Sequence, residues 1–387
     1  MWLRRAFVVV VAAAIVVPAA PAAASATDLF RPFETIRTGS DPENVAIGDV
    51  TGDGRADVLL STSEYSDPAN DDKLFVFPQR ADGSLGSAVR YPTRMTYFDH
   101  SAGGIALLDA NGDGRRDVAL ATLAGVEIFH QTATGTLENR GVLPGTAPAN
   151  TIVAADADSD GDDDLVVGRR EEGATGIVQL TQQADATFSV SVVTTEPTAE
   201  VEVGDVDGDG RLDIVGFWAR ELYVYHRTDD GWRRTSHTPA GGYSRWVNGI
   251  EVADVSGDGR ADVIATVGGN FPSSVVNVFV QTDAGALASA AVYQTPDIPD
   301  PVEAADIDGD GRTDVVTAHA GWYQMSTLLQ LPDGTLDWPL TSALPYASDY
   351  EAQGLATGDI NGDGRTDIVI ADYNHGLVVL RNAGTAT

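Results

Sequence analysis

Asp205-Val206-Asp207-Gly208-Asp209-Gly210-Arg211-Leu212-Asp213 is a nine-residue stretch with carboxylates at its positions 1, 3, 5 and 9. Glycines at positions 4 and 6 allow a turn that is too tight for residues with a β-carbon. Ca²⁺ takes roughly six to eight oxygen ligands from carboxylates and backbone carbonyls. The four aspartates would give side-chain oxygens, and Arg211 would give its carbonyl oxygen. Because four bare carboxylates would repel one another here, the stretch predicts a cation-binding loop, shorter than that of an EF-hand.

The same pattern recurs along the chain. Seven copies lie at residues 49–57, 109–117, 156–164, 205–213, 254–262, 306–314 and 359–367. Their starts are 47 to 60 residues apart, position 6 is always Gly, and position 9 is always Asp. One copy alone would also fit a solvated acidic turn, but chance does not produce seven. A period of this length is typical of propellers or solenoids rather than of unrelated domains.

The predicted ligands differ between loops at position 3, which is Asp in three loops, Asn in two, and Thr51 or Ser256 in the others. Fewer charged ligands mean weaker Ca²⁺ binding, so we expect the loops with Thr51 and Ser256 to be weakest. Residues 156–164 carry Ser159 instead of glycine and extra acids, which leaves tight binding and self-repulsion both open. The predicted ligands are Asp49, Thr51, Asp53, Arg55, Asp57; Asp109, Asn111, Asp113, Arg115, Asp117; Asp156, Asp158, Asp160, Asp162, Asp164; Asp205, Asp207, Asp209, Arg211, Asp213; Asp254, Ser256, Asp258, Arg260, Asp262; Asp306, Asp308, Asp310, Arg312, Asp314; Asp359, Asn361, Asp363, Arg365, Asp367.

The composition agrees with a calcium-rich extracellular protein. The formal net charge is −33, and the seven loops hold 26 of the 57 acidic residues. Such a charge opposes binding to nucleic acid and to anionic membranes. The chain has no cysteine, so it has no disulfide framework and no thiol chemistry.

The N-terminal segment, residues 1–26, reads as a secretion signal. Arg4 and Arg5 precede an apolar run at residues 7–17, and Ala24-Ser25-Ala26 fits a small-residue cleavage site. The general and twin-arginine routes both remain open, and the apolar core favours the general one. The sequence therefore predicts a secreted, monomeric protein without a membrane span.

Each repeat predicts four strands and no helix. A short run before the loop (residues 44–48 or 201–204) is expected to be strand A, and an apolar run after it (58–60, 214–217 or 368–370) to be strand B. Alternating runs at 74–77, 126–129, 222–225 and 276–279 predict strand C. Hairpin turns such as Asp229-Asp230-Gly231 lead into strand D. Four antiparallel strands in a repeat are typical of a propeller blade, so the fold class is all-β.

The ends of the chain predict ring closure. The last unit, residues 359–387, stops just after its strand C, whereas residues 27–48 hold a strand at 33–38 and the first strand A. The N-terminal strand should complete the last blade and leave no open sheet edge. We therefore expect residues 27–387 to form one seven-bladed β-propeller.

The repeated Asp-x-(Asp/Asn)-Gly-Asp-Gly-x-x-Asp motif resembles the FG-GAP or VCBS repeat of integrin α-subunit propellers and of many secreted bacterial proteins. The resemblance covers residues 27–387, and the unclear Phe-Gly and Gly-Ala-Pro elements favour the bacterial VCBS type. It implies calcium loops between strands A and B on one face, with ligands on the other. Members act as adhesion modules, as lectins and occasionally as polysaccharide lyases, so the motif does not fix the activity.

Aromatic and polar residues in the predicted B–C and D–A loops are the ligand candidates, because variable loops on a rigid scaffold carry binding. Flat rings stack on sugars, although these rings would equally pack between blades. The candidates are Tyr97, His100, Tyr243, Arg245, Trp246, His319, Trp322, Tyr323, Tyr350, Tyr373 and His375.

Catalysis is the least favoured reading. The sequence has none of the common metalloprotease, hydrolase or phosphate-loop motifs. His130 and His226 fall at strand C and are expected to be structural. His100, His319 and His375 could converge on the aromatic face, where a His or Tyr base with Arg245 would suit a lyase. The preferred interpretation is a secreted calcium propeller that binds an extracellular polysaccharide. A protein-binding adhesion module is the second interpretation, and a polysaccharide lyase or other carbohydrate-active enzyme is the third.

Overall fold

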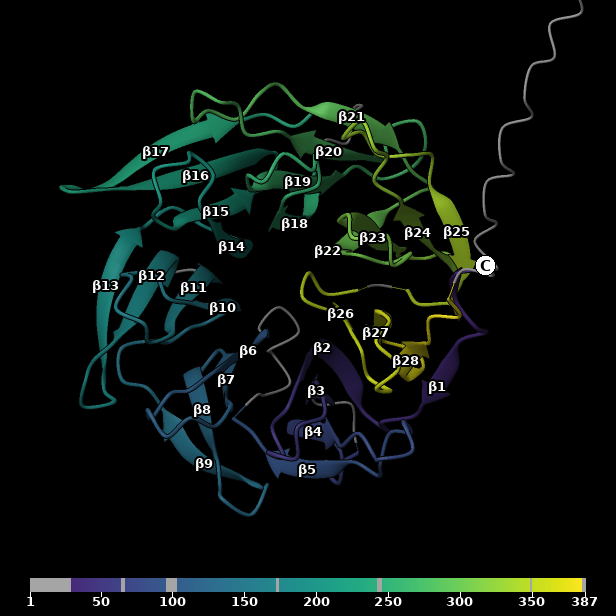
Figure 1. Cartoon of the computed structure of the whole chain (residues 1–387). Helices are drawn as coiled ribbons and strands as arrows, with labels where there is room; N and C mark the ends of the chain where they lie inside the picture. The colour runs from purple at the N-terminus through teal and green to yellow at the C-terminus, as the bar shows by residue number, and fades with distance from the viewer. Residues whose placement is uncertain are drawn as a thin grey trace, which may run out of the picture.

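The structure, a computed structural model, describes residues 29–63, 67–94, 103–171, 174–241, 246–348 and 350–384. These residues form seven four-stranded antiparallel sheets arranged in a ring (Figure 1). Within each sheet the strands follow one another from the centre to the rim, and we call them A, B, C and D. The predicted all-β propeller of seven four-stranded blades is confirmed. None of the described residues forms a helix long and apolar enough to cross a membrane.

The inner two strands of each blade flank its Asp-rich loop. The A strands are β2 (Asp41–Gly48), β6 (Ile105–Leu108), β10 (Thr151–Ala155), β14 (Glu200–Gly204), β18 (Val247–Ala253), β22 (Pro299–Ala305) and β26 (Leu355–Gly358). The B strands are β3 (Asp57–Ser63), β7 (Asp117–Thr122), β11 (Asp164–Glu171), β15 (Asp213–Trp218), β19 (Asp262–Val267), β23 (Asp314–His319) and β27 (Asp367–Asp372). Every B strand therefore begins at position 9 of the motif.

The outer two strands complete each blade. The C strands are β4 (Lys73–Phe77), β8 (Gly125–Gln131), β12 (Ala174–Gln182), β16 (Glu221–Thr228), β20 (Val275–Phe279), β24 (Gln324–Leu328) and β28 (Gly376–Leu380). The D strands are β5 (Val89–Pro92), β9 (Leu137–Val142), β13 (Phe188–Thr194), β17 (Gly231–His237), β21 (Ala291–Gln294), β25 (Leu340–Ala343) and β1 (Glu34–Ile36).

The N-terminal strand closes the ring, as the sequence predicts. β1 pairs antiparallel with β28, with Glu34 opposite Val379 and Ile36 opposite Leu377. Figure 1 shows purple β1 beside yellow β28. The paired strand is shorter than the predicted 33–38, and backbone hydrogen bonds such as Arg31 N to Arg381 O (2.9 Å) continue the contact beyond it. The last blade thereby gains its outer strand from the other end of the chain.

Apolar clusters between neighbouring blades form the core. One cluster joins Leu60 and Phe75 of the first blade to Val369 and Leu377 of the last, and all four are nearly or fully buried. The β3 strand is buried along its whole length, which explains its continuous apolar run. Because each cluster draws on two blades, burial of apolar surface stabilises the ring rather than single sheets.

The strand directions give the ring two structurally distinct faces. The A–B loops and C–D hairpins share one face, which we call the Asp-loop face. A β-carbon on Gly83 in the first C–D hairpin would lie 2.6 Å from the carbonyl oxygen of Asn361 in the last A–B loop. The B–C turns and D–A connections lie on the opposite face, which we call the B–C face. The two faces correspond to the predicted metal and ligand sides.

Candidate functional site

The Asp-rich loops fold around the carboxylate at their first position. In the first blade Asp49 Oδ1 accepts hydrogen bonds from the backbone N–H of Gly52 (2.6 Å), and Oδ2 accepts one from Gly54 (2.8 Å). Both glycines have positive φ, +73° and +81°, which residues with a β-carbon adopt only at a cost. The first aspartate accepts the same two amide bonds in the loops that begin at Asp205, Asp254, Asp306 and Asp359.

The aspartate at position 9 ties each loop to strand C. Asp57 is fully buried; its Oδ2 accepts a bond from Val50 N (3.1 Å) and its Oδ1 one from Gln79 N (3.0 Å), just beyond β4. Burial raises the pKa of the equivalent Asp117, Asp164 and Asp314 to about 6. A neighbouring cation favours the charged form of such carboxylates. This position therefore both orders the loop and faces its interior.

Three loops gather carboxylates closely enough for one ion. Ligand atoms lie within 4.8 Å of one another in the groups Asp156–Asp158–Asp160, Asp205–Asp207–Asp209 and Asp306–Asp308–Asp314. These are the three loops with Asp at position 3. Oxygen donors of this kind fit a hard divalent cation such as Ca²⁺.

The loops with Asn at position 3 are arranged differently. The side-chain amide of Asn111 donates to Asp117 Oδ2 (3.0 Å), and that of Asn361 donates to Asp367 Oδ2 (2.6 Å). In these loops the position-9 carboxylate oxygen that would bind a cation accepts a hydrogen bond from the asparagine amide instead. The predicted grading of the loops remains a prediction.

The arginine at position 7 has a side-chain role that the sequence reasoning missed. Its guanidinium pairs with the carboxylate at position 5, as in Arg55–Asp53, Arg115–Asp113 and Arg312–Asp310. Arg55 Nε also donates to the carbonyl oxygen of Gln79 (2.9 Å). In the fourth blade Arg211 lies 3.8 Å from Asp209 and also pairs with Asp229 (2.8 Å) in the C–D hairpin. The arginine therefore offsets loop charge, whereas its predicted role as a carbonyl ligand is untested.

A glutamine just beyond or at the end of strand C links each of several loops to the next blade. Gln131, Gln182 and Gln281 donate through Nε2 to the carbonyl oxygens of Asp49 (3.3 Å), Asp109 (3.0 Å) and Asp205 (2.8 Å). Asn382 takes this role in the last blade, donating to Ile307 O (2.7 Å). Gln recurs at this place in five repeats, so the sequence itself carries a signal for this contact. The conformation of each of these loops is thus coupled to the packing of its blade against the neighbouring blade.

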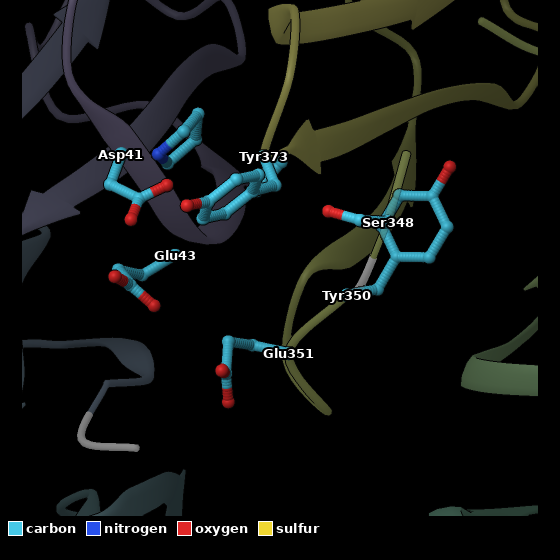
Figure 2. A pocket seen from close by; sticks show the side chains of 8 residues that line it. Asp41, Glu43, Ser348, Tyr350, Glu351 and Tyr373 are labelled. Atoms are coloured by element: carbon cyan, nitrogen blue, oxygen red, sulfur yellow. The ribbon is translucent and has the colours of Figure 1, made fainter. Parts of the chain in front are cut away.

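The B–C face has a hollow that we call the mouth. One cavity of about 440 Å³ is lined by Asp41, Pro42, Glu43, Ser348, Tyr350, Glu351, Ala371 and Tyr373. A second cavity, of about 370 Å³, shares Tyr350 and Glu351 and adds residues including Arg170, Trp218, Trp246 and Asp300. Figure 2 shows that β2, the segment before β26 and the turn after β27 all contribute side chains to the first cavity.

Carboxyl groups and aromatic rings line the mouth together. Burial raises the pKa of Asp41 to about 6, and the hydroxyl of Ser63 donates to Glu43. The ring of Tyr373 is 41 % exposed, whereas Tyr350 is buried, which raises the pKa of its hydroxyl. Trp246 is 53 % exposed, with the guanidinium of Arg220 5.5 Å from its ring centroid. The mouth therefore offers flat apolar faces beside hydrogen-bond acceptors.

A second surface, which we call the aromatic groove, lies between the fifth and sixth blades. Its cavity of about 410 Å³ is lined by Phe271, Trp322 and Trp338 together with Asp297, Gln294 and Gln324. The three aromatic side chains are 66 %, 43 % and 76 % exposed. Trp338 was not among the predicted ligand residues, because it precedes strand D rather than lying in a B–C loop.

The predicted ligand residues do not form one continuous site. Trp246, Tyr350 and Tyr373 line the mouth, whereas Trp322 lines the aromatic groove. Tyr323 packs on Tyr346 with ring centroids 5.5 Å apart, and His375 Nδ1 lies 3.0 Å from Asp372 Oδ1. Predicted residues that lie outside the described part of the chain are Tyr97, His100, Tyr243 and Arg245, as is the predicted signal at residues 1–26.

The prediction that His319 belongs to the ligand surface does not fit the structure. β23 extends to His319, and the side chain is fully buried. Its Nδ1 lies 3.0 Å from Asp297 O, and its Nε2 lies 2.8 Å from Ser326 Oγ. Burial lowers the pKa of the imidazole to about 4, so the ring is neutral and structural.

Four glutamates line the central channel, which the sequence reasoning also missed. Glu200, Glu202, Glu251 and Glu303 come from the A strands of blades four to six and border a cavity of about 300 Å³. Burial raises the pKa of Glu200 and of Glu251 to about 8, and those of Glu202 and Glu303 well above the usual range. The described residues that line this cavity include no lysine, arginine or histidine.

Comparison with known proteins finds a family model that matches three regions of the chain. The family model described as "FG-GAP-like repeat" matches residues 109–167, 205–265 and 306–370. No curated protein matches the chain. The residues matched are three pairs of neighbouring A–B units, which agrees with the repeats found by inspection.

Solved structures similar to this chain include proteins of several kinds. A lectin of Agrocybe aegerita, solved for its recognition of non-reducing terminal N-acetylglucosamine, is 17 % identical with a TM-score of 0.55, covering 89 % of this chain and 94 % of that one. BBS1N, solved in complex with ARL6DN, is 14 % identical with a TM-score of 0.61 and coverages of 93 % and 98 %. Virginiamycin B lyase of Staphylococcus aureus is 12 % identical with a TM-score of 0.55 and coverages of 91 % and 99 %.

At these identities the likeness to solved structures shows the fold alone. A binding protein and an enzyme both appear among them, so the ring does not select an activity. The chain is a seven-bladed β-propeller that carries FG-GAP-like repeats in three regions.

Proposed function

We propose that this chain is a secreted, calcium-stabilised binding module that recognises carbohydrate at the mouth of its B–C face. The observation that carries the proposal is the combination of exposed Trp246 and Tyr373 rings with the carboxyl groups of Asp41, Glu43 and Glu351 in adjoining cavities. Sugar rings present apolar C–H faces and polar hydroxyl edges. An aromatic ring packs against the former, and carboxylate oxygens accept hydrogen bonds from the latter.

The character of the cavity also favours a polar ligand over an apolar one. Drug-like apolar ligands bind in pockets lined mainly by hydrophobic side chains. The first mouth cavity instead has three carboxyl residues, a serine and two tyrosines among its eight lining residues. The fold of the Agrocybe aegerita lectin supports the proposal only in showing that a similar ring serves sugar recognition.

In this proposal calcium ions occupy the Asp-rich loops and act structurally. The loops lie on the face opposite to the mouth, so the ions stabilise the blades without touching the ligand. The predicted signal at residues 1–26 would place the mature chain, residues 27–387, outside the cell, where Ca²⁺ is plentiful.

A protein-binding adhesion module is the second candidate, and the aromatic groove favours it. Exposed tryptophans are enriched among the residues that dominate protein–protein binding. Phe271, Trp322 and Trp338 would present such a cluster between the fifth and sixth blades. The lyase interpretation loses one candidate base, because His319 is buried.

The test is binding of the mature protein to a panel of soluble polysaccharides and oligosaccharides in millimolar Ca²⁺, with product formation followed in the same samples. We expect saturable binding that Trp246→Ala and Tyr373→Ala weaken at least about tenfold. Trp322→Ala and Trp338→Ala are the matched controls, because they remove equally exposed rings from the aromatic groove.

Each other result points elsewhere. Binding lost only in the groove variants would move the carbohydrate site to the groove. New reducing ends or unsaturated sugars would establish an enzyme. Absence of any binding across the panel would refute the carbohydrate proposal and favour a protein partner at the groove.

A further inference from the structure

The fourth blade holds a buried histidine beside its Asp-rich loop. His226 lies in β16 and is 94 % buried, since its exposed fraction is 6 %. Its Nδ1 lies 3.1 Å from Oδ2 of Asp207 and 3.2 Å from Oδ2 of Asp213. These two aspartates are positions 3 and 9 of the loop, so the imidazole faces the carboxylates from the interior of the blade.

The three side chains form a compact group of mixed donors. The ligand atoms of Asp207, Asp213 and His226 all lie within 4.8 Å of one another. A second group, Asp205–Asp207–Asp209, shares Asp207 but has only oxygen donors. The loop therefore has an outer position suited to Ca²⁺ and an inner position with a nitrogen donor.

The hydrogen bonds around the ring are compatible with a cation at the inner position. His226 Nε2 lies 3.0 Å from the hydroxyl oxygen of Thr235. If Nε2–H donates to that hydroxyl, the lone pair of Nδ1 points at two carboxylate oxygens. Three acceptors facing one another require either a proton on Nδ1 or a metal ion between them. An outer hydrogen bond of this kind is also what orients histidine ligands in metal sites.

The distances suit a small ion. Metal–ligand bonds of about 2.1 Å in tetrahedral or octahedral geometry place neighbouring ligand atoms about 3.0 to 3.4 Å apart. The two measured separations fall in this range. Imidazole nitrogen is a preferred donor for first-row transition metals, whereas Ca²⁺ prefers oxygen. Arg233, 3.6 Å from Asp207 and half exposed, is the nearest competing cation.

The sixth blade gives an internal comparison. Its loop has the same carboxylates at positions 1, 3, 5 and 9, and Gln330 N donates to Asp314 as Arg227 N donates to Asp213. Leu329 therefore stands where the fourth blade has His226. The second blade is intermediate: His130 occupies this place, but position 3 is Asn111, and Nε2 lies 3.9 Å from Asp117.

We propose that Asp207, Asp213 and His226 form a transition-metal site inside the fourth blade, which takes Zn²⁺ or Co²⁺ in preference to Ca²⁺. This site is additional to the oxygen-only loops. The inference rests on the proposal that the Asp-rich loops hold cations, and it goes beyond that proposal in assigning a second chemical class of metal to one blade.

The test uses Co²⁺ as the spectroscopic probe and Zn²⁺ as the competitor, with the purified protein in millimolar Ca²⁺. We expect one equivalent of Co²⁺ to bind, with visible absorption bands of nitrogen ligation, and one equivalent of Zn²⁺ to displace it. His226→Leu, which installs the residue of the sixth blade, should weaken Co²⁺ binding at least about tenfold. It should leave Ca²⁺ stoichiometry unchanged. Leu329→His should create a second Co²⁺ site in the sixth blade.

Two results would overturn the inference. One is Co²⁺ binding that is equally tight in the wild type and in His226→Leu. The other is a wild-type protein that binds Ca²⁺ but no Co²⁺, with nitrogen NMR showing Nδ1 of His226 protonated. If the protein binds Ca²⁺ but no Co²⁺, only the transition-metal proposal fails. If no loop binds any cation, the calcium proposal fails as well. His226→Gln distinguishes loss of the metal from loss of folding, because it keeps a polar side chain of similar size.

Discussion

Replacing Glu200 with glutamine should stabilise the protein, and more so as the pH rises. Glu200 is 97 % buried, with an exposed fraction of 3 %, and its Oε2 accepts a hydrogen bond from Ile250 N (2.9 Å). Burial raises its pKa from 4.5 to about 8, and the neighbouring Glu251 adds to the effect. The folded protein therefore binds a proton that the unfolded chain has already lost near neutral pH.

The sign and size of the effect follow from this difference. Between pH 4.5 and about 8 the folded state binds more protons than the unfolded state, so the free energy of unfolding falls as the pH rises. A pKa difference of about 3.5 corresponds to about 3 kcal/mol at pH 7 and to at most about 5 kcal/mol above pH 8. Glutamine is neutral and retains an acceptor for Ile250 N, so Glu200→Gln removes this loss. The gain is large beside a typical unfolding free energy of about 5–15 kcal/mol.

The assay is urea denaturation of wild type and variant at pH 5, 7 and 8.5 in constant millimolar Ca²⁺. We expect a stability difference of less than about 1 kcal/mol at pH 5, rising by a few kcal/mol at pH 8.5. Glu138→Gln is the control, because Glu138 is exposed and its pair with Arg140 contributes little. An unchanged or reduced stability of Glu200→Gln at pH 8.5 would refute the account of the channel.

Three further predictions concern the loops and the mouth. Gly285→Ala should lower the free energy of unfolding by more than about 2 kcal/mol, because φ is +69° and the new β-carbon would lie 2.2 Å from Asp207 O. Gly231 is the control, because it holds the same place in the fourth hairpin but a β-carbon there would meet no atom within 4 Å. Gly231→Ala should lower the free energy of unfolding by about 1 kcal/mol in the same denaturation assay. Gln281→Ala removes the bond to Asp205 O (2.8 Å) and should cost about 1–3 kcal/mol while weakening Ca²⁺ binding in calorimetry; equal Ca²⁺ affinity would contradict the coupling of loop and blade. Trp246→Ala and Tyr373→Ala should leave the melting temperature within about two degrees of wild type, because both rings are exposed, and a larger fall would show that they pack structurally.

Much of the fold could be predicted because its information is local and repeated. Glycine at position 6 and aspartate at position 9, which are Gly210 and Asp213 in the fourth loop, recur in all seven loops. The number of blades therefore follows from counting the loops. The apolar runs after position 9 identify strand B, since strands buried on both faces read as continuous hydrophobic segments. The closure by β1 followed from the incomplete last repeat and is confirmed by its pairing with β28.

The residues that sequence reasoning missed act between blades. Gln281 matters because it reaches the loop of the preceding blade, and Glu202 because its neighbours are Glu251 and Glu303 across the channel. Inspection of one repeat does not show which residue of the next repeat lies nearby. His319 was predicted to lie in a B–C loop, but it is the last residue of β23 and its ring is fully buried.

The mouth was only partly predictable. Asp41 and Glu43 belong to it because β2 begins at Asp41, three residues earlier than the predicted strand. A register shift between Pro42 and Val45 accompanies this extension. Aromatic residues drew attention as ligand candidates, whereas the acids beside them did not stand out in a chain with 57 acidic residues.

The most direct test of the account is the melting temperature of the mature protein in millimolar Ca²⁺ and in excess chelator. At a free Ca²⁺ concentration about 100 times the dissociation constant, each occupied loop adds about 2.7 kcal/mol to the free energy of unfolding. Chelation should lower the melting temperature by many degrees, and added Ca²⁺ should restore it. An unchanged melting curve in chelator would contradict the structural role of calcium in the seven loops.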